Sequence, residues 1–131
     1  MPIGDTTSPE IERVCQQVVD AAFAVHKKMG PGLLESVYEE CLCHELSLRK
    51  LSFRKQIDLP VVYKDVRLEC GYRIDVIVEG SVLLELKCVE KILPIHEAQL
   101  LTYLRLSGTK VGLLINFNVP VLKDGIVRRV L

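Results

Sequence analysis

The chain lacks any excess of one charge. It has 17 basic and 17 acidic residues, so its formal net charge at pH 7 is +0. Without net charge there is no overall field to draw the protein toward nucleic acid, and any such contact must be local. The densest basic cluster is Arg49, Lys50, Arg54 and Lys55. A solvated turn explains these four residues at least as well.

Long apolar runs and a recognisable leader are also missing. No run approaches the roughly 20 apolar residues needed to cross a bilayer. Residues 1–9 contain neither a basic start nor an apolar core of the kind found in secretory signals. These absences predict a cytoplasmic protein.

Cysteine is present, but not in a pattern that binds metal. The five cysteines are an odd number and include no CxxC pair. Most of them stand in apolar segments, where cysteine usually acts as a small buried hydrophobe. We therefore expect reduced thiols and no iron–sulfur cluster. The cysteines are Cys15, Cys41, Cys43, Cys70 and Cys88.

What the chain does have is enough apolar material for one core. Its 131 residues are 49% hydrophobic and 26% charged, which is typical of a single globular domain. We expect one domain over residues 1–131, with residues 1–8 as a flexible N-terminus.

Three helices are predicted from apolar spacing and start signals. The first follows Ser8–Glu10, which supplies an N-cap, a proline and an acid, and it ends near Met29. The second covers about 33–50, and the third covers about 95–106 after Pro94. The residues expected on the buried faces of the first two are Ile11, Val14, Cys15, Val18, Val19, Ala22 and Val25, then Leu34, Val37, Tyr38, Cys41, Leu42, Leu46 and Leu48.

Strands fill the remaining apolar runs. Because strands precede and follow the third helix, the chain should form an α/β fold with a mixed central sheet flanked by helices. The third helix should link two parallel strands in a right-handed crossover. The predicted strands are 53–63 (interrupted near 58–60), 66–78, 82–89, 111–117 and 125–130.

Asp75, Glu85 and Lys87 form an unusual pattern within two of these strands. Strand side chains alternate between faces, so Glu85 and Lys87 share one face while Leu84 and Leu86 take the other. A hairpin turn at 79–81 would place Asp75 directly opposite Glu85. Like charges in that position are destabilising, and a buried carboxylate is costly unless it is paired or binds metal.

Asp75, Glu85 and Lys87 have the residue types expected for metal-assisted phosphodiester hydrolysis. Carboxylate oxygens suit Mg²⁺ or Mn²⁺, which keeps several waters and needs few protein ligands. A lysine beside the acids could hold the attacking water and offset charge in the transition state. The alternative is that Asp75, Glu85 and Lys87 are solvated residues on an exposed strand face.

Other polar residues are candidates for the same site. Glu35 stands in the first turn of the second helix, where the helix dipole alone favours an acid; it matters only if that helix end points at Asp75 and Glu85. Gln99 and Tyr103 are four residues apart and share a helix face, either in the site or exposed. His96, one turn earlier, is a weaker candidate.

The set Glu35, Asp75, Glu85-Leu86-Lys87 and Gln99-xxx-Tyr103 resembles the PD-(D/E)XK nuclease superfamily, and in particular its RecB-like and Cas4-like branch. The run 32–38 is similar to the signature of the GxxExxY family. The resemblance covers roughly residues 10–131. It implies a restriction-endonuclease-like αβββαβ core.

The resemblance also implies a role for each residue. Asp75 and Glu85 would bind the metal with the Leu86 backbone carbonyl, and Lys87 would position the water. Glu35 would reach a metal or its water, and Gln99 and Tyr103 would support the site or contact the substrate backbone. The cysteines do not match the spacing of the iron–sulfur enzymes in this branch, and no DNA-recognition domain is appended.

The leading hypothesis is therefore a small Mg²⁺- or Mn²⁺-dependent nuclease, with DNA favoured over RNA as its substrate. The alternative is a nucleic-acid-binding or accessory module that keeps the nuclease scaffold without useful turnover. A purely structural protein–protein module ranks last. A domain this small covers only a short stretch of nucleic acid, which is compatible with a homodimer.

Overall fold

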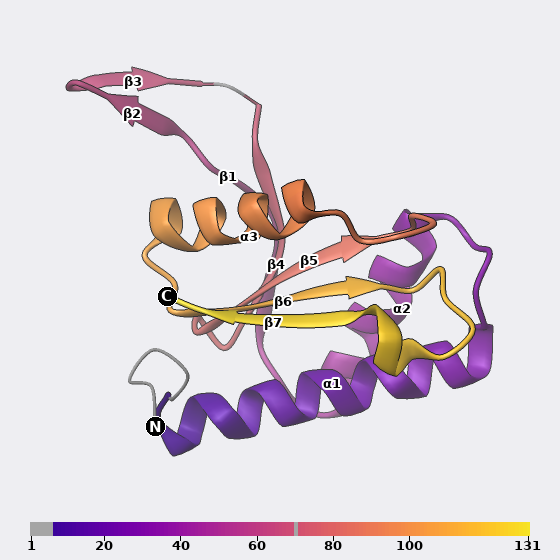
Figure 1. The fold of residues 1–131 in the computed structure, drawn as a ribbon. Helices are drawn as coiled ribbons and strands as arrows, with labels where there is room; N and C mark the ends of the chain where they lie inside the picture. Colours follow the sequence, from indigo (N-terminus) through magenta and orange to yellow (C-terminus); the bar gives the residue numbers. More distant parts are fainter. Residues whose placement is uncertain (1–6, 70) are drawn as a thin grey trace.

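The computed structural model describes residues 7–69 and 71–131. It is an α/β fold in which a five-stranded mixed sheet lies between two layers of helices (Figure 1). The elements are α1 (Pro9–Met29), α2 (Glu35–Leu48), β1 (Phe53–Asp58), β2 (Val61–Tyr63), β3 (Val66–Leu68), β4 (Arg73–Val78), β5 (Val82–Lys87), α3 (Pro94–Ser107), β6 (Val111–Asn116), the 3₁₀ helix η2 (Leu122–Gly125) and β7 (Ile126–Val130). Among the described residues, no helix has the length and apolar character needed to span a membrane.

The sheet has the strand order β1-β4-β5-β6-β7. β1, β4 and β5 pair antiparallel, whereas β5 and β6 pair parallel. α3 supplies the connection between those two parallel strands. The predicted mixed sheet flanked by helices is therefore confirmed.

Two clusters of buried side chains fill the space on either side of the sheet. On one side α1 and α2 pack on residues such as Val76, Leu84 and Leu113. On the other side Leu100 and Leu104 of α3 pack with residues such as Leu83 and Leu114. β5 and β6 are consequently buried on both faces, as expected for central strands between helices.

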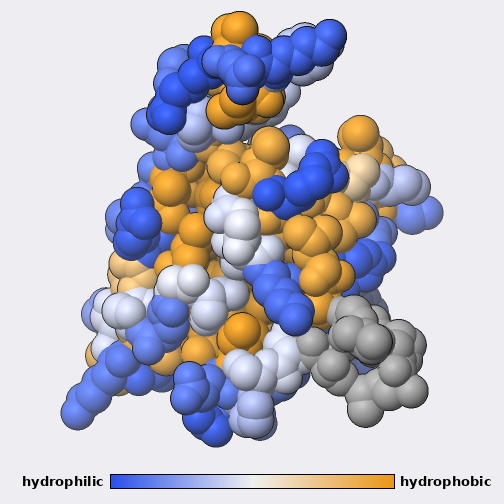
Figure 2. Space-filling view, turned by 90° about the vertical axis from the view of Figure 1, so that its left-hand side faces the viewer, coloured by the Kyte–Doolittle hydropathy of each residue, from blue (hydrophilic) through white to orange (hydrophobic). Residues whose placement is uncertain are grey.

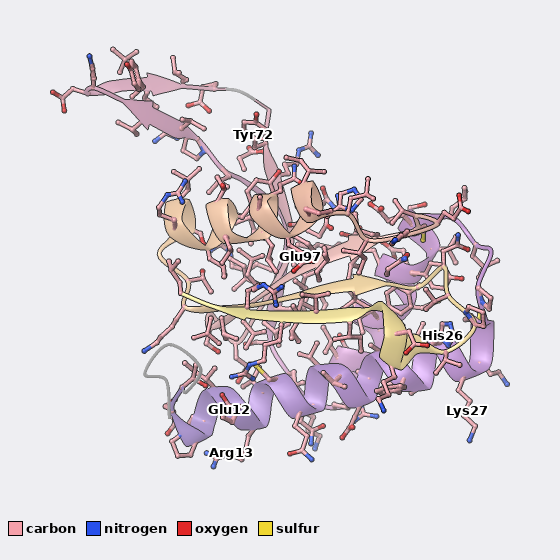
Figure 3. The ribbon with its side chains drawn as sticks, viewed as in Figure 1. Glu12, Arg13, His26, Lys27, Tyr72 and Glu97 are labelled. Carbon is pink, nitrogen blue, oxygen red and sulfur yellow. The ribbon has the colours of Figure 1, made fainter. Side chains whose placement is uncertain are left out.

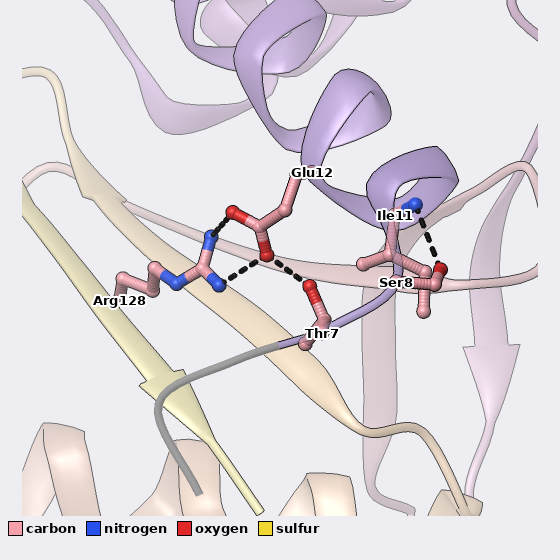
Figure 4. Close-up of polar contacts among 5 residues, drawn as sticks. All are labelled: Thr7, Ser8, Ile11, Glu12 and Arg128. Atoms are coloured by element: carbon pink, nitrogen blue, oxygen red, sulfur yellow. Dashed lines mark hydrogen bonds and ion pairs between the residues drawn. The ribbon is translucent and has the colours of Figure 1, made fainter. Parts of the chain in front are cut away.

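The start of α1 is fixed by local and long-range polar contacts (Figure 4). Ser8 caps the helix, because its hydroxyl accepts a hydrogen bond of 3.2 Å from the Ile11 amide. Glu12 pairs with the Arg128 guanidinium of β7 at 3.0 and 2.6 Å, and it also accepts a hydrogen bond from the Thr7 hydroxyl. Thr7 and Ser8, which the sequence analysis assigned to a flexible N-terminus, thus form hydrogen bonds.

The largest departure from the sequence expectation is a projecting hairpin. The run 66–78 was predicted as one strand, but β3 ends at Leu68 and β4 begins at Arg73. β2 and β3 pair only with each other and form a second, two-stranded sheet that stands away from the body (Figure 1). A turn with Lys64 and Asp65 at positive φ, 47° and 67°, closes this hairpin. We call Val61–Leu68 the arm.

Smaller corrections concern the ends of elements. α2 is shorter than predicted, and Leu34 and Leu48 at its ends are 73% and 63% exposed rather than buried. β5 ends at Lys87 instead of extending to 89. After Lys87 the chain turns away, and the Asn116 side chain at the end of β6 bonds to both backbone groups of Val89 at 3.1 and 2.9 Å.

Candidate functional site

The β4–β5 hairpin brings Asp75 and Glu85 together. Its paired register runs from Val78↔Val82 to Val76↔Leu84 and ends there, one residue before Asp75 and Glu85. The predicted turn at 79–81 is confirmed: the Ser81 amide donates to the Val78 carbonyl at 3.0 Å.

Each of the two acids also bonds to the backbone of the opposite strand. The Asp75 amide donates to Glu85 Oε1 at 3.3 Å, and the Leu86 amide donates to Asp75 Oδ2 at 2.8 Å. These hydrogen bonds hold both carboxylates at fixed positions where the strand ladder ends.

Both acids are held where their charged forms are unfavourable. Burial, together with the neighbouring Asp75 charge, raises the pKa of Glu85 from 4.5 to about 8. Burial also raises the pKa of Asp75 from 3.8 to about 6, although the hydrogen bond from Leu86 opposes the rise. Glu85 is only 5% exposed, so the solvated-face alternative does not apply to it. Adjacent buried acids of this kind are typical of functional sites.

Glu35 lies beside this pair. It is the first residue of α2, and its pKa is raised by burial but lowered by the nearby positive charge of Lys87. Its negative charge in turn contributes to the raised pKa values of Asp75 and Glu85. The N-terminus of α2 therefore points at the acidic patch, which is the condition that made Glu35 a candidate.

Tyr38 explains how the chain before Glu35 is positioned. Its hydroxyl donates to the Gly30 carbonyl and accepts from the Leu33 amide at 3.2 Å. Its fully buried ring stacks on Phe117, with centroids 4.6 Å apart and planes 4° apart. The loop also needs Gly32 at φ +100°, a conformation that favours glycine. Tyr38 therefore holds the loop that precedes Glu35 in place.

A small cavity of about 110 Å³ opens between α2, β1 and β4. It is lined by Glu35, Ser36, Glu39, Gln56, Asp75 and Leu86. Sequence reasoning missed Ser36, Glu39 and Gln56 as members of this site. The signal for Glu39 was its position four residues after Glu35, on the same helix face. We call this space the acidic cavity.

Gln56 has no comparable sequence signal. In the β1–β4 register it stands opposite Asp75, between the pairs Lys55↔Val76 and Ile57↔Ile74. Its φ is +52°, which is unusual for a residue with a side chain. This positive φ shows that β1 is locally distorted where it meets the site. The side-chain amide nitrogen of Gln56 donates to Glu39 Oε1 at 2.6 Å.

Lys87 provides the positive charge at the end of β5. It stands opposite Asn116 of β6, and its carbonyl accepts from the Phe117 amide at 3.0 Å. Its charge lowers the pKa values of Glu35, Asp75 and Glu85. The structure therefore places one ammonium group within electrostatic reach of all three acids.

α3 presents Gln99 and Tyr103 to the same region from the other face. The Gln99 amide nitrogen donates to the Tyr103 hydroxyl at 3.1 Å. Tyr103 is 6% exposed, and its pKa is raised by burial and by the nearby charges of Glu85, Tyr72 and Asp75. His96 accepts a hydrogen bond of 2.9 Å from the Leu93 amide, which fixes the start of the helix.

Two other sequence candidates have different surroundings. In the basic cluster, Arg49 pairs with Glu45 at 3.4 Å and Lys55 pairs with Glu40 at 3.0 Å, so half of that charge is compensated. Of the cysteines, Cys15 and Cys43 are buried and Cys41 and Cys88 are half-buried, all as free thiols; Cys70 lies outside the described residues. Burial raises the pKa of Cys43 to about 11.

The donor set fits a hard divalent cation. Within residues 7–69 and 71–131, no group of three or more His, Cys, Asp or Glu side chains is arranged to enclose a metal. Mg²⁺ does not need such a cage, because it commonly takes one or two carboxylates and keeps its waters. Asp75 and Glu85 could supply those carboxylates, and burial raises the pKa of both, so their charged forms are unfavourable without a nearby positive charge.

Comparison with known protein families agrees with this geometry. The model of the PD-(D/E)XK nuclease superfamily matches residues 12–130. The chain belongs to the PD-(D/E)XK nuclease superfamily. Comparisons with curated proteins and with solved structures each found no match. Enzymes of this superfamily usually hydrolyse phosphodiester bonds of nucleic acids and generally use divalent metals such as Mg²⁺ or Mn²⁺.

Proposed function

We propose that this protein is an active Mg²⁺- or Mn²⁺-dependent nuclease that cleaves DNA in preference to RNA. The observation that carries the proposal is the buried pair Asp75 of β4 and Glu85 of β5, with Lys87 at the end of β5. Such a pair is costly without bound positive charge. Within the superfamily, the GxxExxY family and the RecB-like and Cas4-like branch fit the residues best.

Each residue of the site then has a chemical task. Asp75 and Glu85, with the Leu86 carbonyl, would hold the metal, which on binding supplies Lewis-acid stabilisation of phosphate charge. Because metal ligands must be deprotonated, both acids would hold the metal as carboxylates. Glu35 would receive a metal-bound water from the α2 side.

Lys87 acts at the reacting phosphate. Its ammonium group can donate a hydrogen bond to the attacking water and offset the negative charge that develops in the transition state. Gln99 and Tyr103 support it from α3. The Gln99–Tyr103 hydrogen bond orients the amide, leaving its oxygen free to accept from a water at the substrate backbone.

The direct test is cleavage of single-stranded, duplex and branched DNA, and of matching RNA, with Mg²⁺ or Mn²⁺ and with EDTA. We expect metal-dependent cleavage of DNA that Asp75→Asn abolishes. Asp58→Asn is the matched control, since Asp58 is an exposed β1 residue whose nearest ion pair, to Arg73, is 3.6 Å long. No cleavage of any substrate, together with no metal-dependent thermal shift, would reject the proposal.

One observation keeps the accessory-module alternative in the test. The described residues form no three-ligand metal cluster, which is also the arrangement expected of a scaffold without turnover. That alternative predicts salt-sensitive nucleic-acid binding that survives Asp75→Asn, with no metal-dependent activity to lose. Turnover by the unmodified chain decides between the two.

A further inference from the structure

An open groove of about 800 Å³ lies between the arm and α3. Lys87, at the end of β5, forms one part of its wall, Tyr72 lies just before β4, and most of the rest comes from one side of α3. The lining residues are Val61, Tyr72, Lys87, Ile95, His96, Ala98, Gln99, Thr102, Tyr103, Arg105 and Leu106. We call this space the α3 groove.

The charge of the α3 groove differs from that of the acidic cavity and of two further pockets, one beside the first half of α1 and one between α1 and α2. Its wall contains Lys87 and Arg105 and no acid, whereas each of the others has at least one glutamate in its wall. Arg105 forms no ion pair with any residue in the described part of the chain. In a protein without net charge, this wall therefore has a local excess of basic side chains.

The groove also offers apolar and aromatic surface. Tyr72 is 46% exposed, and its ring is tilted by 60° against that of Tyr103, with centroids 6.2 Å apart. Ile95 and Leu106 on α3 are 67% and 38% exposed. Figure 3 shows Tyr72 between the arm and α3, and Figure 2 shows hydrophobic surface continuing from the arm onto the body below it.

The groove leads directly to the candidate active site. Lys87, Gln99 and Tyr103 belong to its wall, and Tyr103 is close enough to Glu85 for that charge to raise its pKa. A chain molecule lying along the groove would therefore pass the lysine proposed to act at the scissile phosphate.

We propose that the α3 groove holds an unpaired DNA strand, with a base stacked on Tyr72 and a phosphate at Arg105. This inference rests on the proposed nuclease function and names its substrate class. Aromatic side chains combined with a cationic groove are how proteins bind single strands. A duplex keeps its bases stacked inside and would leave Tyr72, Ile95 and Leu106 without partners.

The same lining favours DNA over RNA. An RNA strand carries a 2′-hydroxyl on every sugar, and a hydroxyl placed against apolar surface loses free energy unless it finds a hydrogen-bond partner. Four of the eleven side chains that line the α3 groove, Val61, Ile95, Ala98 and Leu106, offer a 2′-hydroxyl no hydrogen-bond partner.

Binding in EDTA separates this proposal from turnover. Fluorescence anisotropy would compare a labelled mixed-sequence DNA strand of about 12 nucleotides with the matching duplex and RNA. We expect Tyr72→Ala to weaken single-strand binding by about 5- to 150-fold, since base–aromatic stacking contributes about 1–3 kcal/mol. Tyr72→Phe keeps the ring and should bind normally. Tyr63→Ala is the matched control, because Tyr63 is a 62% exposed tyrosine of the arm outside the groove wall.

Salt dependence tests the phosphate contact. Arg105→Gln should reduce the slope of log affinity against log salt by about 0.7, the value for one phosphate of a single strand. Arg13→Gln is the control and should leave the slope unchanged, because Arg13 lies on α1, at the opposite side of the molecule from Tyr72 (Figure 3).

The outcomes for the two proposals are distinct. Equal effects of Tyr72→Ala and Tyr63→Ala, or an equal loss for duplex, would overturn the groove assignment even if metal-dependent cleavage is found. Tighter binding of RNA would overturn the choice of DNA. Tyr72-dependent strand binding without any cleavage would support the groove and reject the nuclease.

Discussion

The acidic cavity and the α3 groove lie on opposite sides of the end of β5 and have opposite chemistry. The acidic cavity is small, about 110 Å³, and contains Glu35, Glu39 and Asp75. The α3 groove is larger, about 800 Å³, and has cations, an exposed tyrosine and no acid. Glu85 and Lys87 stand on the strand between them.

The difference shows how a chain of zero net charge can still handle a charged substrate. Glu35, Glu39 and Asp75 line one space and Lys87 and Arg105 line the other, so each space has a local charge that the net charge does not reveal. Because exposed charges are screened within about 8–10 Å at physiological salt, only groups near the end of β5 take part. Overall charge therefore says little about function here.

The largest effect is expected from removing Lys87, the cation between the acidic cavity and the α3 groove. We expect Lys87→Met to lower kcat by about 100- to 1,000-fold, the usual cost of losing one group that stabilises transition-state charge. Metal binding should persist or become tighter, because Lys87 competes electrostatically for the same acids. Single-turnover kinetics and Mn²⁺ titration calorimetry measure the two effects. Loss of metal binding in this variant would contradict the division of roles.

The loop before Glu35 can be made less ordered without changing an acidic residue. Tyr38→Phe keeps the stack on Phe117 but leaves the Gly30 carbonyl and the Leu33 amide without their partner. We expect a loss of about 1–3 kcal/mol in unfolding free energy, measured by urea denaturation, together with weaker metal binding through a less ordered Glu35.

Tyr63→Phe is the control for that variant, since Tyr63 is 62% exposed and should lose almost nothing. If Tyr38→Phe were as stable as the unmodified protein, the loop before Glu35 would not depend on this hydroxyl.

Acidic pH should stabilise the metal-free protein. In the folded state the pKa values of Glu85 and Asp75 are raised to about 8 and about 6, so the folded state binds more protons than the unfolded chain between about pH 4 and pH 8. Stability must then fall as pH rises through that window. The two shifts correspond to several kcal/mol across this range, so we expect Tm in EDTA to drop by about 10 °C or more from pH 5 to pH 8.

Two comparisons check the origin of that slope. Glu85→Gln should flatten most of it, because the glutamine does not titrate. Saturating Mg²⁺ should raise Tm most at pH 8, where the acids are most readily ionised. A slope unchanged in Glu85→Gln would show that other groups set the pH dependence.

The smallest effect is expected outside both cavities. Lys55→Ala removes an exposed cation that is already paired with Glu40 at 3.0 Å. We expect less than a twofold change in DNA affinity and less than about 0.5 kcal/mol in stability, measured by anisotropy and by thermal melting. A larger loss of affinity than in Arg105→Gln would show that the basic cluster, and not the α3 groove, binds the strand.

Much of the site could be predicted because its signals are local. The run 71–88 contains two strands and a turn, so counting residues through 79–81 predicted that Asp75 and Glu85 come close together, and the Asp75 amide does bond to Glu85 Oε1. The Gln99–Tyr103 pair follows from helix geometry in the same way, and the structure gives the amide a partner within the pair itself.

The predictions that were wrong also have physical reasons. In 66–78 the signal for a break is Gly71, a residue type that often interrupts a strand, but the apolar residues on both sides of it favour strand equally. The spacing of Leu34 and Leu48 predicts buried side chains. Leu34 instead precedes α2 and Leu48 ends it, and both side chains are exposed. Gln56 joined the site through pairing between β1 and β4, which are distant in sequence.

The sequence by itself determined the order of the elements, the facing acids and the lysine, since these depend on strand alternation, helix periodicity and one short turn. Only the tertiary structure decided that α2 delivers Glu35 to the acids, that the arm leaves the sheet, and that Lys87 and Arg105 line one groove while Glu35 and Asp75 line another cavity. Those outcomes depend on long-range packing, such as Tyr38 on Phe117 and β5 beside β6, which brings together residues whose spacing along the chain carries no record of their contact.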